Sequence, residues 1–244
     1  MNVHKKIFLI VTLLASHSVG GFSKPIIEER LTKPTIILGL YQLMKDIHEL
    51  FGAYNIPYCI EGGTLIGALR HKGIIPWDVD LDIWVHQDYI EAFLALEPLF
   101  SKLGYEISYD PQMGYLVKGK VGSDDIVCDI FPIKKRKNRY EYARRGTVRW
   151  YHRRDRKADW PNEQELFPYT LYKFGTFYVY GPHDPWRFLD ELYENWRTTA
   201  RFLTQQKYVS ETVLLTDEDT APALPLGPLE DRVAPLLKSH KEKP

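Results

Sequence analysis

Cysteine is scarce in this chain of 244 residues: only Cys59 and Cys128 occur, and both lie within apolar runs. Two cysteines exclude a disulfide-stapled scaffold and the four-cysteine ligand set of a structural zinc site. We expect packed thiols, with a disulfide between the two as the less favoured alternative. Internal repeats and low-complexity tracts are also lacking, which excludes a fibrous or disordered chain.

The chain has no net charge, because 32 Lys and Arg residues balance 32 Asp and Glu residues. The distribution is nevertheless uneven: residues 134–157 hold twelve basic residues against only Glu141 and Asp155. A basic segment of this kind suits phosphates or other polyanions. A solvated insertion is an equally good interpretation of residues 134–160, and we expect no nucleic-acid partner.

Long apolar runs are missing as well. Residues 7–15 form an apolar run of nine that follows Lys5 and Lys6 and precedes small and polar residues. This order is typical of a secretory signal peptide, which we assign to residues 1–20. A run of nine is much shorter than the ~20 residues of a spanning helix, so no transmembrane anchor is expected. The expected location is the secretory pathway or an exported one, whether lumenal, periplasmic or extracellular.

Hydrophobic periodicity then predicts a mixture of helices and strands. Apolar residues recur at steps of three and four over residues 34–55 and 87–103, which predicts amphipathic helices. Residues 57–60, 105–108, 115–121 and 126–130 are typical of strands, and a short helix is expected over residues 64–71. A strand pair and a helix over residues 185–202 follow. The predicted fold is therefore of the α+β class, with a C-terminal helical and strand extension.

The most informative stretch is Glu61 to Val85, EGGTLIGALRHKGIIPWDVDLDIWV. Strand alternation predicts that Asp78, Asp80 and Asp82 line one face while the intervening apolar residues are buried on the other. Those apolar residues are Val79, Leu81 and Ile83. A further carboxylate, Asp129, lies inside an apolar strand, where burial is costly unless something pairs with it.

Clustered carboxylates are the ligands that Mg²⁺ or Mn²⁺ prefers, usually shared with substrate phosphates. We therefore predict Asp80, Asp82 and Asp129 as the metal-binding and catalytic residues, and the alternative is a set of surface carboxylates. For Asp78 the two interpretations are equally good.

The Gly-Gly turn before the short helix predicts a phosphate contact. Residues without a Cβ let backbone N–H groups and a helix N-terminus approach a phosphate closely. We assign Gly62, Gly63 and Thr64 to donor binding, with positive charge supplied by Arg70 and Lys72 at the far end of the helix. Neither a Walker motif nor a dinucleotide-binding fingerprint occurs in the sequence.

The stretch GGTLIGALRHKGIIPWDVDLDI closely resembles the LicD and fukutin-related family of the nucleotidyltransferase-fold superfamily. Later segments add to the resemblance: Asp129-Ile-Phe-Pro132, Leu166-Phe167-Pro168, Phe174-Gly175, Tyr193 and Trp196. The resemblance implies a nucleotidyltransferase-like mixed sheet flanked by helices, over a catalytic domain that we place at residues 21–205. Residues 206–244 are expected to form a loosely held tail.

The activity that the resemblance implies is that of a LicD-like phosphotransferase. Such an enzyme moves a phospho-alcohol, such as phosphocholine or ribitol or glycerol phosphate, from a CDP-activated donor to a hydroxyl of a glycan or glycoconjugate. By position, the family's Gly-Gly corresponds to Gly62 and Gly63, and its three carboxylates to Asp80, Asp82 and Asp129. Two alternatives remain open: a nucleotidyltransferase that attaches a nucleoside monophosphate, and a catalytically idle nucleotide-binding protein.

Overall fold

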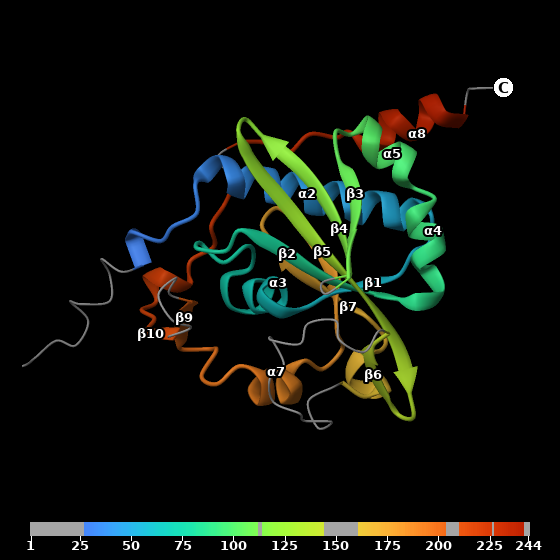
Figure 1. Cartoon of the computed structure of the whole chain (residues 1–244). Helices are drawn as coiled ribbons and strands as arrows, with labels where there is room; N and C mark the ends of the chain where they lie inside the picture. The colour runs from blue at the N-terminus through green and yellow to red at the C-terminus, as the bar shows by residue number, and fades with distance from the viewer. Residues whose placement is uncertain (1–26, 112–113, 144–160, 204–209, 226, 242–244) are drawn as a thin grey trace, which may run out of the picture.

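The computed structural model describes residues 27–111, 114–143, 161–203, 210–225 and 227–241 (Figure 1). The predicted signal peptide and residues 144–160 of the basic insertion lie outside the described residues. Among the described helices, none combines the length and the apolar character needed to cross a bilayer.

The centre of the molecule is a six-stranded mixed sheet in the order β1-β2-β5-β4-β3, with β6 paired to β5. β2 and β5 pair in parallel, whereas the other pairs are antiparallel. The strands are β1 (Tyr58–Ile60), β2 (Asp80–His86), β3 (Glu106–Asp110), β4 (Gly114–Val121), β5 (Asp124–Arg136) and β6 (Arg139–Tyr142). This sheet and its flanking helices confirm the predicted α+β class.

One face of the sheet carries the hydrophobic core. The helix α2 (Pro34–Ala53) packs against β5, β4 and β2 and runs behind the sheet in the view of Figure 1. Its apolar side is buried, as the period of three and four residues predicts, and Pro34 in the first turn leaves no helical hydrogen bond unmade. Cys59 and Cys128 are buried free thiols in this core, which confirms the prediction of packed thiols.

The helix predicted over residues 87–103 is broken into three pieces. They are the 3₁₀ turn η3 (Gln87–Tyr89), α4 (Ile90–Leu94) and α5 (Glu97–Lys102). Pro98 lies in the first turn of α5, where its missing N–H is tolerated, and its ring prevents α4 from continuing through it. The prediction of one continuous helix was wrong for this reason.

The C-terminal part also departs from the prediction. After α6 (Glu163–Leu166), the hairpin β7 (Thr170–Phe174) and β8 (Phe177–Gly181) forms as expected. The predicted helix over residues 185–202 ends early, because α7 covers only Trp186–Leu192 and a turn with Asn195 at positive φ leads into β9 (Thr199–Leu203). β9 pairs with β10 (Ser210–Leu214), and the chain ends in α8 (Val233–Lys241).

Described residues of the C-terminal segment, which was predicted to be loosely held, contact α2 through side-chain hydrogen bonds. Arg232 donates a hydrogen bond of 2.6 Å to Asp46, a carboxylate with no exposed surface. Tyr105 Oη donates to the same oxygen at 2.7 Å. Tyr41 Oη donates to the carbonyl of Ala223 at 2.6 Å. Because these partners come from α2 and from the start of β3, the segment braces the face of the sheet that holds the core.

We predict that Arg232→Met lowers the free energy of unfolding by about 2 kcal/mol, because it leaves the buried Asp46 carboxylate without its cation. Chemical denaturation of the metal-free protein measures this change. Lys33→Met is the matched control: the Lys33–Asp124 pair is 2.7 Å long but the lysine side chain is 65% exposed. Removing such a pair costs about 1 kcal/mol or less. Equal losses in the two variants would contradict the bracing role.

Candidate active site

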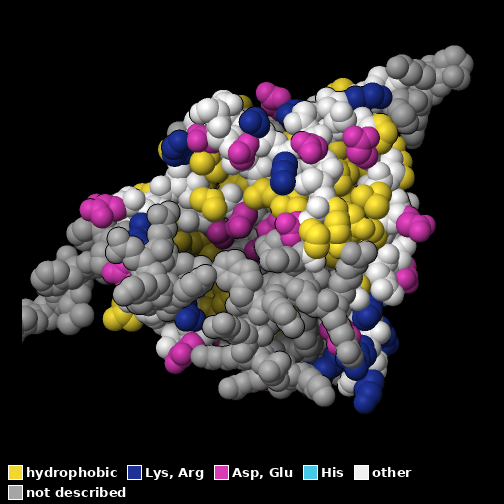
Figure 2. Space-filling model, viewed as in Figure 1, with side chains coloured by type: hydrophobic (Ala, Val, Ile, Leu, Met, Phe, Trp, Pro, Cys, Tyr) yellow, Lys and Arg dark blue, Asp and Glu magenta, His cyan; other side chains and the backbone are white. Residues whose placement is uncertain are grey.

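The paired strands β2 and β5 place acidic side chains side by side on the face of the sheet opposite α2. Asp82 lies directly across from Asp129 in the parallel register, and Asp80 lies two residues before Asp82 on the same face. Asp129 is only 5% exposed. Figure 2 shows acidic side chains gathered over β2 in the middle of this face, next to hydrophobic patches. The structure therefore brings the three predicted carboxylates together.

Asp78 lies before the strand rather than in it, since β2 begins at Asp80. Val79 is accordingly 55% exposed, so the predicted burial of all three alternating apolar residues was wrong at this position. Leu81 and Ile83 are buried as expected. The backbone of Asp78 is fixed by two hydrogen bonds: its N–H donates to the carbonyl of Ile75, and its carbonyl accepts from Thr32 Oγ1 at 2.7 Å. Its side chain still reaches the cluster.

Glu61 is a member of the cluster that sequence reasoning missed. It is 8% exposed, and its carboxylate accepts a hydrogen bond of 3.1 Å from Tyr142 Oη at the end of β6. Its backbone N–H donates to the carbonyl of Asp82 at 3.0 Å, which places it beside the site. The sequence did contain a signal for Glu61. It stands immediately before Gly62-Gly63 at the end of an apolar strand, where burying a charged side chain is costly unless it has a partner.

Gly62 and Gly63 are needed because the carboxylates touch their backbone. These residues open the helix α3 (Gly62–Ile66), which continues into η2 (Gly67–His71). Gly62 has a φ of +52°, and a Cβ there would meet Asp82 Oδ2 at 2.9 Å. A Cβ on Gly63 would meet Asp78 Oδ2 at 2.6 Å. The Gly-Gly pair therefore makes room for acidic side chains at the start of α3.

Thr64 holds the strand that carries the carboxylates. Its buried Oγ1 accepts a hydrogen bond of 2.8 Å from the backbone N–H of Asp82. Glu61 and Thr64 thus occupy both backbone groups of Asp82, which fixes its side chain relative to α3. The structure gives Thr64 this positioning contact, and its predicted part in donor binding stays a prediction.

The two predicted cations differ in how they are held. Arg70 Nε donates to His71 at 2.9 Å, and its Nη1 donates to the carbonyls of Thr199, at 2.9 Å, and of Trp196. Burial lowers the pKa of Arg70 to about 10, an effect partly offset by the negative charge of Asp78. Arg70 thus ties the end of η2 to β9. Lys72 is exposed and donates to the carbonyl of Leu69 at 2.9 Å.

Burial first, and the neighbouring carboxylates second, raise the pKa values of the cluster. Burial and neighbouring negative charge raise the pKa of Asp129 to about 7, while burial chiefly raises that of Glu61 to about 8. The pKa of Asp82 lies well above its ordinary value, through burial first and then the surrounding carboxylates. Asp129 Oδ1 is buried with no hydrogen-bond partner. Crowded acidic oxygens with an unused acceptor are a donor set that fits a hard divalent cation.

Within the described ranges, no group of three or more acidic, histidine or cysteine side chains is arranged so that it could hold a metal ion. Mg²⁺ usually takes only one or two carboxylates and completes its shell with water and substrate phosphate. The pair Asp82 and Asp129, which the register holds on one face, meets that smaller requirement.

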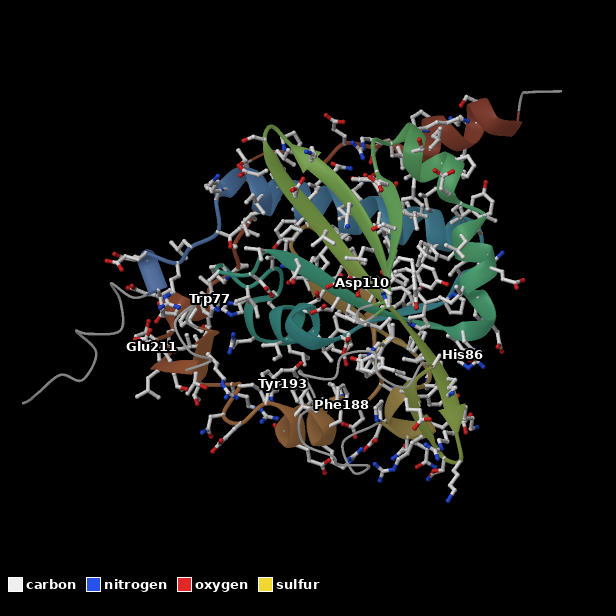
Figure 3. The ribbon with its side chains drawn as sticks, in the orientation of Figure 1. Trp77, His86, Asp110, Phe188, Tyr193 and Glu211 are labelled. Carbon is white, nitrogen blue, oxygen red and sulfur yellow. The ribbon has the colours of Figure 1, made fainter. Side chains whose placement is uncertain are left out.

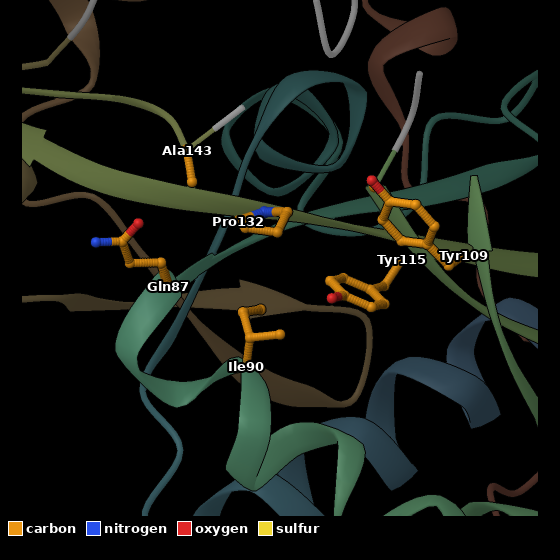
Figure 4. Close-up of a pocket in the computed structure, with 7 residues that line it drawn as sticks. Gln87, Ile90, Tyr109, Tyr115, Pro132 and Ala143 are labelled. Carbon is orange, nitrogen blue, oxygen red and sulfur yellow. The ribbon is translucent and has the colours of Figure 1, made fainter. Parts of the chain in front are cut away.

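A separate cavity of about 280 Å³ lies at the other side of β5 (Figure 4). Tyr109, Tyr115 and Pro132 line it together with residues of η3 and α4. Tyr115 pairs with Ile130, so its side chain points away from the face of Asp129. The ring centroids of Tyr115 and Phe93 are 5.9 Å apart, which places this tyrosine at the edge of the core. The cavity is therefore distinct from the carboxylate cluster.

Residues 55–184 match the family described as LicD/FKTN/FKRP, nucleotidyltransferase domain. An uncharacterized protein of Rickettsia prowazekii is 41% identical over 208 residues, which cover 80% of this chain and 73% of the relative. The chain belongs to the LicD/FKTN/FKRP family. The expected family and its nucleotidyltransferase-like fold are both confirmed.

Two relatives of this family carry descriptive names. The lipopolysaccharide cholinephosphotransferase LicD of Haemophilus influenzae is 53% identical over 52 residues, 21% of this chain and 20% of that protein. The human ribitol 5-phosphate transferase FKRP is 29% identical over 187 residues, which cover 70% of this chain. The chain spans about a third (34%) of the length of this human transferase. Both names describe transferases.

Among solved structures, ANT(2")-Ia in complex with adenylyl-2"-tobramycin is similar to this LicD-family protein with a TM-score of 0.30 and 22% identity. The match covers 41% of this chain and 53% of that structure.

We predict that Gly63→Ala weakens Mn²⁺ binding about tenfold, about 1.4 kcal/mol, because the added methyl group would meet Asp78 Oδ2 at 2.6 Å and push that carboxylate against the neighbouring Asp82, whose Oδ2 lies 3.8 Å from the same position. Isothermal titration calorimetry measures the affinity. Gly52→Ala is the matched control, since a Cβ at that helical position meets nothing within 4 Å. A Gly63→Ala variant that binds Mn²⁺ as tightly as the Gly52→Ala variant would contradict the assignment.

The raised carboxyl pKa values predict how stability depends on pH. Between the ordinary values of 3.8 to 4.5 and the folded values of about 7 to 8, the folded protein binds more protons than the unfolded chain. The free energy of unfolding of the metal-free protein should therefore fall as pH rises through this window. Thermal denaturation in EDTA from pH 4.5 to 8.5 measures it.

Addition of Mn²⁺ should raise the melting temperature more at pH 8 than at pH 5, because protons compete with the ion for the same oxygens. Asp129→Asn should reduce both effects, whereas Asp125→Asn, at a position whose side chain is 80% exposed, should leave them unchanged. A stabilisation by Mn²⁺ that is independent of pH would argue against binding at this cluster.

Proposed function

We propose that this protein is a LicD-like phosphotransferase that depends on Mg²⁺ or Mn²⁺. It transfers a phospho-alcohol, of the phosphocholine or ribitol or glycerol phosphate type, from a CDP-activated donor to a hydroxyl of a glycan or glycoconjugate. The observation that carries the proposal is the placement of Asp82 beside Asp129 under the Gly62-Gly63 turn. Family membership supports it, because named relatives are phospho-alcohol transferases.

The proposed ligands are Asp80, Asp82 and Asp129. A divalent cation held there supplies positive charge to the pyrophosphate oxygens during displacement at phosphorus. Thr64 and Glu61 fix the backbone of Asp82 from both sides, so its carboxylate is held on one face before substrate arrives. Fixed charges of this kind need no reorganisation during the reaction.

In the proposed reaction, the oxygen of the acceptor hydroxyl attacks the phosphorus that bears the alcohol. A new P–O bond forms to the acceptor, the P–O bond to the CMP phosphate breaks, and CMP leaves. The proton of the hydroxyl passes to a carboxylate of the cluster, which is the nearest set of acceptors. The glycines at the start of α3 let the carboxylates of Asp82 and Asp78 lie against the backbone there.

The proposed compartment is lumenal, periplasmic or extracellular, as the first twenty residues predict. CDP-activated donors must then be present in that compartment. Detection of the mature amino terminus near residue 21, by mass spectrometry of the protein recovered from its native host, tests export independently of activity.

We predict that Asp82→Asn and Asp80→Asn each lower the turnover rate at least a thousandfold, about 4 kcal/mol in the activation free energy. The reason is that a neutral amide does not replace a carboxylate as a metal ligand or as a source of charge. The assay follows CMP release from CDP-choline, CDP-ribitol and CDP-glycerol in the presence of a glycan acceptor. Circular dichroism verifies that each variant is folded.

Asp88→Asn serves as the control, because the Asp88 side chain is 71% exposed and, in the described part of the chain, pairs with His86 at 3.3 Å. Its turnover should match that of the wild type. Incubation with CTP or ATP in place of the CDP-alcohols, read by the mass added to the acceptor, distinguishes nucleotidyl transfer from phospho-alcohol transfer. Binding of these donors without any turnover would instead identify a catalytically idle protein, and an active Asp82→Asn variant would refute the assignment of the site.

A further inference from the structure

We infer that Lys118 on β4 binds a pyrophosphate oxygen of the nucleotide donor at the carboxylate site. The inference rests on the proposed function and adds to it a phosphate contact that the sequence does not indicate. Three features of the sheet support it: the register of Lys118, its lack of a partner, and the engagement of the other nearby cations.

The strand register puts Lys118 on the same face as the carboxylates. Lys118 lies opposite Val127 on β5, and Val127 lies opposite Asp80 on β2. Directly opposed residues share a face of the sheet, and so do residues two apart along a strand. Asp129, two residues after Val127, is therefore a diagonal neighbour of Lys118 on the adjacent strand, ~5 Å away in the direction of strand pairing.

Lys118 lies on the same face as the cluster, but no hydrogen bond or salt bridge in the described structure joins it to a carboxylate there. Within the described ranges its ammonium group makes no hydrogen bond or salt bridge, and its side chain is exposed. Glu106 lies opposite it on β3, yet no salt bridge joins the two in the part of the chain that the structure describes. Its positive charge acts on Asp129, whose pKa burial raises and Lys118 alone lowers. A lysine on the rim of an anionic site can thus turn toward a ligand without breaking an existing contact.

Among the residues that the structure describes, the two other cations predicted to serve the site, Arg70 and Lys72, are already engaged. The Arg70 guanidinium is bonded to His71 and to two backbone carbonyls, so donation to a phosphate would cost those bonds. Lys72 donates to Leu69 at the far end of the helix from the Gly62-Gly63 turn. A donor pyrophosphate carries several negative charges that one divalent ion between carboxylates does not balance, so a further cation on this face is favourable.

A second unused polar group on the same face supports a ligand in this direction. Ser108 on β3 shares a row with Leu116 and Asp129, and its buried Oγ has no hydrogen-bond partner in the described structure. A buried hydroxyl without a partner is unfavourable unless a ligand or water supplies one. Asp110, labelled in Figure 3, follows Ser108 on the same face and borders this region.

The test is calorimetric and uses inorganic pyrophosphate as the probe, with the folded full-length chain. Titrations measure the affinity for Mn²⁺ alone and then for pyrophosphate in the presence of saturating Mn²⁺. Lys118→Gln should lower the affinity for pyrophosphate about tenfold, while the affinity for Mn²⁺ alone stays the same or rises, because a repelling charge has been removed. Lys118→Arg should retain most of the pyrophosphate affinity.

Lys120→Gln is the matched control. Lys120 lies two residues further along the same face of β4, but its side chain is 74% exposed and pairs with Asp125 at 3.6 Å. Its replacement should change neither affinity. Opposite effects on the two ligands distinguish a phosphate contact from a loss of structure, which would weaken both.

Pyrophosphate affinity of Lys118→Gln equal to that of Lys120→Gln would overturn the inference, and so would a parallel loss of Mn²⁺ affinity. If the wild type binds Mn²⁺ and pyrophosphate but transfers no phospho-alcohol from the CDP donors, the proposed function fails while the contact of Lys118 stands. A wild type that binds Mn²⁺ but no pyrophosphate contradicts both.

Discussion

The arrangement of this protein depends on holding several carboxylates together, out of water, on one face of a β-sheet. Like charges that are buried side by side repel one another and lose their hydration, so they persist only where the chain fixes their positions. β2 and β5 do this through their parallel register, which sets Asp82 against Asp129. The long connection through α4, α5, β3 and β4 is a consequence, because parallel neighbours require a crossover.

The opposite face of the sheet is packed against α2, and the carboxylate face adds apolar burial of its own where Trp84 contacts Phe188. α2 covers the opposite face with an almost continuous apolar surface, and the C-terminal segment is fastened over α2 through Asp46 and Tyr41. The two faces of the sheet therefore have different roles. The face covered by α2 is tightly packed, and the carboxylate face keeps acidic and basic side chains available to a ligand. The two buried cysteines lie close in sequence to site residues, Cys128 next to Asp129 and Cys59 two residues before Glu61, and burial raises the pKa of both thiols.

Sequence patterns predicted the parts of the site that follow from local rules. Alternation correctly placed Asp80 and Asp82 on one face. The cost of burying Asp129 predicted a partner for it, but its Oδ1 has no hydrogen-bond partner in the described structure, so the ion expected to pair with it stays a prediction. The same rule failed at Asp78 and Val79 because alternation does not mark where a strand begins. Glu61 and Lys118 were missed for a different reason. Their roles depend on which strands are neighbours and in what register, and a single sequence does not contain that information.

The contacts of Arg70 bear on the role of Asp78. The sequence left this role undecided between a metal ligand and a surface carboxylate. The positive charge of Arg70 acts on Asp78 and partly offsets the rise in the pKa of that carboxyl. It also accepts a hydrogen bond from the backbone N–H of Val79 at 3.2 Å. Asp129, by contrast, keeps a buried oxygen with no partner. A cation gains most where negative charge is least compensated, which favours Asp82 and Asp129 over Asp78 as its ligands. Asp78 Oδ2 thus lies against Gly63 and within the influence of the Arg70 charge, and a part outside the metal shell stays a prediction for it.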